Sequence, residues 1–159
     1  MARYDFDIDL SDYRSIRQRL ASLLPGYRRR INDTMARGAR NGLNDVLDEW
    51  KRESTELAPL DTGTLRRGIQ TEVSGQDLNV RGGISVSAVE MTGSGRFDYA
   101  HYIHEVYPEK YGDSFQNPAT PGTIPRFLDK PAEENQARWV RMIEDEIKAE
   151  MRAAGYEVK

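Results

Sequence analysis

The pattern of apolar and polar residues changes type several times along the chain, and each change predicts a new element. Residues 3–10 alternate between charged and apolar side chains, which is typical of a half-buried strand. Apolar residues between 13 and 24 then recur at spacings of three and four. Ser11 is a suitable N-cap in front of them, so a short first helix is predicted before Pro25.

A single apolar stripe at helical spacing predicts a long helix from Tyr27 to Leu57. At 1.5 Å per residue it would extend about 45 Å. Pro59 disfavours the helical conformation of the residue before it, so the helix should end near Leu57. Gly38 and Gly42 lie on one face and each lowers helix propensity by about 1 kcal/mol relative to Ala. They predict either a bend or a site of close packing.

Beyond the long helix the periodicity changes from helical spacing to alternation. Alternating residues predict strands at 69–73, 78–88 and 97–106, joined by turns at 74–77 and 92–95. Helical spacing returns from residue 129 to 154 and predicts a C-terminal helix that packs antiparallel to the long one. The chain is therefore predicted to be α+β, with an antiparallel β-meander packed against a long N-terminal helix and a C-terminal helix.

The segment 106–126 is rich in proline and glycine and has little periodicity. An irregular connection of about 20 residues is unusual in a compact domain and tends to be functional or disordered. Tyr107, Tyr111 and Phe115 are rigid apolar anchors of the kind enriched at the centres of interfaces. They are expected either to become ordered against a partner or to fold back on the sheet.

The junction between the helical and the alternating parts is a predicted turn. Asp61 and Thr62 side chains can bond nearby backbone amides, and Gly63 can adopt positive φ without steric cost. Leu65 is expected to return to the core behind this turn. Arg66 and Arg67 are expected to face outward, near a neighbouring molecule.

Composition limits the class of protein. The 159 residues suit a single domain, 1–159, and 31% are charged against 38% apolar. Cysteine is absent, which excludes disulfides and thiolate sites and fits assembly in a reducing cytoplasm. No leader or membrane-spanning run is evident, so a protein without a membrane partner is expected. A net charge of -3 gives no global attraction to nucleic acid.

Candidate enzyme chemistry is sparse. Asp98, His101, His104 and Glu105 are the one cluster of potential metal ligands or acid–base groups. If they lie on a strand, as predicted, the two histidines point to opposite faces, and a joint metal site is not expected. The Asp-Thr-Gly triplet at 61–63 lacks the second copy that an aspartic protease needs. We therefore expect no catalytic residues, no metal and no cofactor.

The first half of the long helix is basic, and this pattern has two interpretations. The side chains could form a solvated helix surface, or they could contact a ring neighbour or passing DNA. The residues concerned are Arg28, Arg29, Arg30, Arg37 and Arg40. A DNA-binding accessory protein that uses this helical arm is the alternative function, and its binding would depend strongly on salt.

Three segments resemble, in order and spacing, one family. The first, Ala58 to Ile69, has a helix end in Ala-Pro followed by Asp-Thr-Gly-Thr-Leu-Arg; the second, Tyr99 to Glu105, begins Tyr-Ala-His-Tyr; the third, Pro125 to Ala132, reads Pro-Arg-Phe-Leu-Asp-Lys-Pro-Ala. In this pattern the chain resembles the head-tail joining proteins of long-tailed bacteriophages, also called tail-completion, neck or minor capsid proteins. The resemblance covers roughly residues 10–151.

The resemblance implies a structural virion protein rather than an enzyme. It implies a tail-terminator-like fold with the second segment on a strand. It also implies a homo-oligomeric ring, most commonly a hexamer, in the neck between the head connector and the tail tube. Connector, stopper and terminator proteins would be its partners, and DNA would pass through the lumen without sequence-specific binding. The expected interface residues are Asp61, Thr62, Arg66, Arg67, Tyr107, Tyr111 and Phe115.

Overall fold

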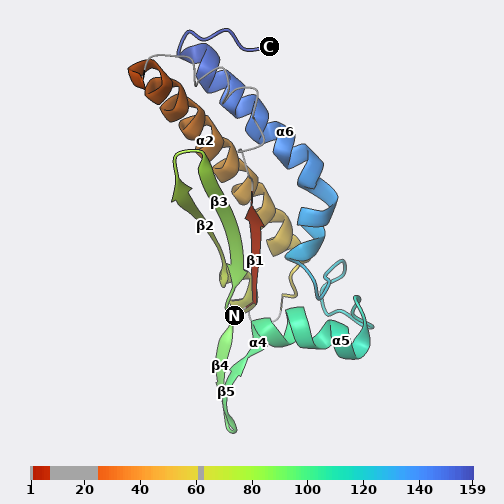
Figure 1. Cartoon of the computed structure of the whole chain (residues 1–159). Helices are drawn as coiled ribbons and strands as arrows, with labels where there is room; N and C mark the ends of the chain where they lie inside the picture. The colour runs from red at the N-terminus through yellow and green to blue at the C-terminus, as the bar shows by residue number, and fades with distance from the viewer. Residues whose placement is uncertain (1, 8–24, 61–62) are drawn as a thin grey trace. The chain divides into compact units, whose positions relative to one another are not determined.

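A computed structural model describes residues 2–7, 25–60 and 63–159 (Figure 1). The described helices are α2 (Pro25–Leu57), α3 (Thr64–Arg67), α4 (Tyr99–His101), the π-helical turn η2 (Tyr102–Val106), α5 (Tyr107–Tyr111) and α6 (Asp129–Ala153). The strands are β1 (Ala2–Asp7), β2 (Ile69–Gln76), β3 (Asn79–Val86), β4 (Val89–Thr92) and β5 (Gly95–Asp98). The chain is α+β, as predicted. The first helix predicted near residues 11–24 lies outside the described residues.

The chain divides into two compact units. The first unit contains residues 1–5, 47–72 and 83–136, and the second contains 6–46, 73–82 and 137–159. Helices α2 and α6 and strands β2 and β3 each continue from one unit into the other. The organisation as a single domain stays a prediction.

The second unit is built around the close approach of α2 and α6. A Cβ atom added at Gly38 would lie 2.6 Å from the Cα of Ile147, and one added at Gly42 would lie 2.8 Å from the Cα of Ile143. Along α2 the contacts run from Gly38 to Gly42, while along α6 they run from Ile147 back to Ile143. The two segments are therefore antiparallel, as predicted. The two glycines therefore mark close packing rather than a bend.

The core of the first unit joins the end of α2 to the beginning of α6. The indole Nε1 of Trp50 donates a hydrogen bond of 2.8 Å to the carbonyl of Leu128, and both residues are fully buried. Leu65 is buried as well, as the sequence predicts. Helix α2 ends at Leu57, where the carbonyl accepts a 2.9 Å hydrogen bond from the amide of Ile124. The helix end predicted from Pro59 is confirmed.

The strands form two small sheets. One has three strands in the order β1-β3-β2, and the other is the antiparallel hairpin β4-β5, with Val89 opposite Asp98 and Thr92 opposite Gly95. The turn between β2 and β3 lies at Asp77 and Leu78, after the predicted turn at 74–77 has begun, and Asp77 has a φ of 52°. The segment 78–88, predicted as one strand, ends its pairing as β3 at Val86.

Candidate functional site

The segment 99–111, predicted to begin as a strand, is helical in the structure. The Oδ1 atom of Asp98 accepts a 3.1 Å hydrogen bond from the amide of His101 and so caps α4. Ala100, Ile103 and His104 are buried at helical spacing. The strand expected over 97–106 therefore ends at Asp98, because an N-cap and a buried helical face override the strand propensity of the tyrosine and isoleucine residues.

This correction changes the placement of the two histidines. His101 is exposed, whereas the side chain of His104 is only 5% exposed. The two histidines differ because they lie on different faces of a helical segment, not on opposite faces of a strand. His104 lies in η2, a π-helical turn, and such turns frequently occur at functional sites. Among the described residues, no group of three or more histidine and acidic side chains is arranged to hold a metal ion.

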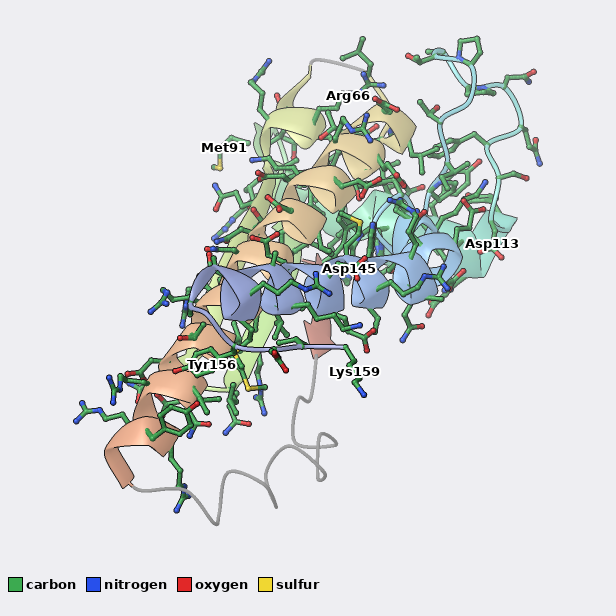
Figure 2. The ribbon with its side chains drawn as sticks, turned by 90° about the horizontal axis from the view of Figure 1, so that it is seen from above. Arg66, Met91, Asp113, Asp145, Tyr156 and Lys159 are labelled. Atoms are coloured by element: carbon green, nitrogen blue, oxygen red, sulfur yellow. The ribbon has the colours of Figure 1, made fainter. Side chains whose placement is uncertain are left out.

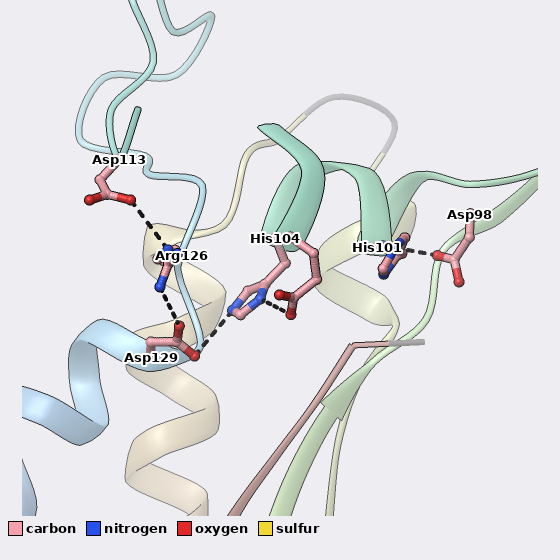
Figure 3. A network of polar contacts seen from close by, with 7 residues as sticks. Asp98, His101, His104, Asp113, Arg126 and Asp129 are labelled. Atoms are coloured by element: carbon pink, nitrogen blue, oxygen red, sulfur yellow. Dashed lines mark hydrogen bonds and ion pairs between the residues drawn. The ribbon is translucent and has the colours of Figure 1, made fainter. Parts of the chain in front are cut away.

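His104 belongs to a chain of alternating acidic and basic side chains (Figure 3). Its Nδ1 atom lies 2.8 Å from Oε1 of Glu105, and its Nε2 atom lies 3.4 Å from Oδ1 of Asp129, the first residue of α6. Arg126 continues the chain, with Nη1 3.8 Å from Oδ2 of Asp129 and Nε 3.2 Å from Oδ1 of Asp113. The network therefore joins η2, α6 and residues 112–128, which we call the connection.

The environment of His104 favours its charged form. Burial alone would lower the pKa of the imidazole, but the carboxylates of Asp129 and Glu105 outweigh burial and raise its pKa above the usual 6.5. The contact with Asp129 is an ion pair rather than an aligned hydrogen bond, because Nε2 meets no hydrogen-bond geometry. The ring of Phe127 packs edge-on against the imidazole with centroids 5.5 Å apart.

The connection lines one side of an open, uncharged cavity of about 420 Å³ in the first unit. Tyr99, Ile103 and Tyr107 form one wall, since they are spaced four residues apart on a helical face. The ring of Phe115 contacts that of Tyr107 with centroids 5.0 Å apart. The remaining lining residues are Pro59, Leu60, Gln116, Asn117, Pro118, Ala119, Thr120 and Thr123. None of the lining residues is charged.

The aromatic residues predicted as interface anchors therefore divide. Tyr107 and Phe115 pack on one another and line the cavity, whereas Tyr111, whose ring contacts Tyr107, is 56% exposed. The connection predicted at 106–126 also begins later than expected, since α5 occupies Tyr107–Tyr111. The role of these residues at an interface stays a prediction.

The two arginines that follow the turn after α2, Arg66 and Arg67, differ in their contacts. Gly63 has a φ of 77°, as its predicted role requires, while Asp61 and Thr62 lie outside the described residues. Arg66 does not simply face outward. Its Nε donates a 2.9 Å hydrogen bond to the carbonyl of Ala58 and its Nη2 donates a 3.3 Å bond to that of Glu56, so it caps the end of α2. Arg67 is exposed, as predicted.

The basic side chains of α2 also fall into two groups. Arg37 lies 3.5 Å from Glu150, and Arg40 donates a 3.0 Å hydrogen bond to the carbonyl of Gly75. Arg28, Arg29 and Arg30 are exposed in the first turns of the helix. The role of the five arginines at a DNA channel or an interface stays a prediction.

Sequence reasoning missed the ionic network. The sequence marks His104 and Glu105 as potential metal ligands or acid–base groups, but no pattern connects Asp113, Arg126 and Asp129 with them. The one available signal was the spacing of Asp98, Ala100, Ile103 and Tyr107, which fits a capped helix. Chemically, the site can hold a proton between two carboxylates beside an uncharged cavity.

None of the described helices is long and apolar enough to cross a membrane. Comparison with protein-family models, with curated proteins and with solved structures finds no match.

Proposed function

We propose that this chain is a head-tail joining protein of a long-tailed bacteriophage, a non-enzymatic structural protein that forms a ring in the neck. The observation that supports it is that the three segments carrying the resemblance lie together in the first unit. They are separated by up to about seventy residues in sequence, from Ala58 to Ala132, yet they share contacts, which supports their treatment as one structural pattern.

The contacts among these segments involve their most characteristic residues. Arg66 of the first segment binds the carbonyl of Ala58, where the helix ends in Ala-Pro. Pro59 and Leu60 share the cavity with Tyr99 and Ile103 of the second segment. His104 of the second segment contacts Asp129 and Phe127 of the third, as described above. Each motif thus has a structural task in the same core.

Exposed apolar side chains on the first unit are the residues through which the proposed assembly could be tested. Met91, labelled in Figure 2, is 81% exposed, and Leu60 and Tyr111 are about half exposed. Large apolar side chains that stand in solvent are typical of surfaces that bind other proteins when they gather into a patch. In a closed ring each copy would use two different surfaces, one toward each neighbour.

The ring can be tested by native mass spectrometry over a range of protein concentrations, with images of the negatively stained particles. A closed ring, most simply a hexamer, is the expected result, either alone or on addition of a phage connector. Met91→Ser and Tyr111→Ser should weaken the ring without unfolding the protomer. Asp145→Asn, an exposed substitution on α6, is the control. A monomer that no connector or tail preparation converts into a ring would contradict the proposal.

A second candidate function rests on Arg28, Arg29 and Arg30. These side chains are exposed, and no ion pair among the described residues occupies them. They could bind the phosphates of duplex DNA, either in a ring lumen or in a separate accessory protein. Binding that loses affinity steeply as salt rises, and that charge reversal of the three arginines removes, would favour this candidate. Absence of binding at low salt would eliminate it.

A further inference from the structure

The imidazole of His104 connects two segments that are far apart in the chain. Glu105 is its neighbour in η2, whereas Asp129 begins α6 on the other side of the connection. The contact therefore closes residues 105–128 into a loop whose two ends meet at His104. Closing such a loop costs conformational entropy, and this contact helps to offset it beside the hydrogen bonds of Ile124 to Leu57 and of Trp50 to Leu128.

The geometry specifies the protonation state in which this contact is favourable. One ring nitrogen faces Glu105 at 2.8 Å and the other faces Asp129 at 3.4 Å. Only the imidazolium ion carries a proton on both nitrogens, because a neutral imidazole has one donor and one lone pair. Loss of the proton therefore directs a lone pair at one of the two carboxylates, and the attraction on that side becomes repulsion.

When His104 loses its proton, the contact that breaks is the one with Asp129, because Glu105 and Arg126 favour this outcome. Glu105 is adjacent in sequence and half exposed, so it can keep the single remaining N–H. Asp129 is mostly buried and has Arg126 as a second partner, which in turn is paired with Asp113. Asp129 thus retains a cation when His104 becomes neutral. Phe127, whose ring packs edge-on against the imidazole, is uncharged.

We propose that His104, Glu105 and Asp129 form a proton-dependent latch that holds the connection beside the cavity and releases it as the pH rises. The two walls of the cavity lie on the two sides of this latch. Tyr99, Ile103 and Tyr107 belong to the helical segment that carries His104, and Phe115 to Thr123 belong to the connection that Asp129 terminates. Opening the latch therefore loosens one wall against the other.

The direction of the pH effect follows from the raised pKa of His104. The folded protein binds the proton more tightly than the unfolded chain, so the latch contributes its full stability below about pH 6.5. That contribution is lost as the pH rises through the higher pKa of the folded state. The inference does not depend on the proposed function.

Two measurements on the full chain test the latch. The chain contains two histidines, so an NMR titration of the imidazole nitrogens can assign each with the His101→Gln variant. The pKa of His104 should lie above its usual value of 6.5. Within residues 112–123 the amides of Gly112 and Thr123 donate backbone hydrogen bonds. Hydrogen exchange detected by mass spectrometry, corrected with an unfolded control at each pH, should then show protection of this segment decreasing between pH 6 and pH 9. The decrease should be about tenfold for each pH unit by which the pKa of His104 exceeds its usual value.

Variants distinguish the latch from a general effect of pH. In Asp129→Asn and in His104→Gln, protection of residues 112–123 should be low already at pH 6 and should depend little on pH. His101→Gln should behave as the wild type does. If His104→Gln does not fold, Asp129→Asn with its intact imidazole carries the test, through a decrease in the pKa of His104. The proposal is overturned if the wild type and Asp129→Asn show the same protection at both pH values, or if the pKa of His104 is not raised above 6.5.

Discussion

The helix pair of the second unit and the latch of the first unit both hold together segments that are distant in sequence, but they use different physics. At Gly38 and Gly42 the backbone of α2 approaches that of α6 so closely that no side-chain atom fits between them. At His104 the segments are held by charges that exist only in one protonation state. A steric contact between two segments is therefore independent of pH, whereas a contact made by a buried titratable charge depends on it.

The largest effect is expected from filling the close contact between the helices. Gly38→Ala should lower the free energy of unfolding by about 3 kcal/mol, because its Cβ meets the backbone of Ile147, which cannot rotate away. Urea denaturation measures the loss. Gly26→Ala, also in α2, has no atom within 4 Å of the added methyl group and should be neutral or slightly stabilising. Equal changes in the free energy of unfolding at both positions would show that helix propensity, rather than packing against α6, determines the effect of Gly38→Ala.

A smaller loss is expected when the latch loses its carboxylate. Asp129→Asn should lower the free energy of unfolding by about 1–2 kcal/mol at pH 6, since the charged imidazole then lacks one of its partners. The same urea titration measures it. Asp145→Asn, on the exposed face of α6, should change the free energy little. An unchanged free energy of unfolding in Asp129→Asn would show that the contact between His104 and Asp129 does not stabilise the fold.

The pH dependence separates the two kinds of joint. Because the pKa of His104 is raised in the folded state, the stability difference between wild type and His104→Gln should be largest at pH 6 and should shrink toward pH 9. The cost of Gly38→Ala should stay the same over this range. Denaturation curves of the three proteins at both pH values test this, and a constant difference for His104→Gln would refute a protonation-dependent joint.

The smallest effect is expected at the surface of the helix pair. Arg37 and Glu150 lie 3.5 Å apart, but the arginine side chain is 61% exposed, so their coupling should be below about 0.5 kcal/mol. A double-mutant cycle with Arg37→Met and Glu150→Gln measures it. A coupling as large as that of the latch would show that burial is not what gives the His104 network its strength.

Much of the fold could be predicted from local signals. Proline and glycine placed the end of α2, the turn at Gly63 and the turn between β4 and β5, and the apolar stripes placed α2 and α6. The close packing of the helices was one of two alternatives for Gly38 and Gly42. Sequence alone could not choose between them, because the choice depends on what the other helix presents at Ile143 and Ile147.

The error at residues 99–106 has a specific cause. Tyrosine and isoleucine favour strands, and the local pattern contains both, but the tertiary structure buries Ala100, Ile103 and His104 together. The network around His104 was beyond reach for a different reason. Its partners come from positions 105, 113, 126 and 129, and no periodicity relates residues whose proximity depends on the path of an irregular connection.

The hydrogen bond from Trp50 to Leu128 gives the molecule an intrinsic optical reporter. Indole fluorescence is sensitive to its polar neighbours, and Leu128 is adjacent to Asp129 in the chain. Trp139, the second tryptophan, is fully buried in the other unit and supplies a background signal. Motions at the start of α6 can therefore be followed in unlabelled protein, in real time, by the emission of a residue that the fold already requires.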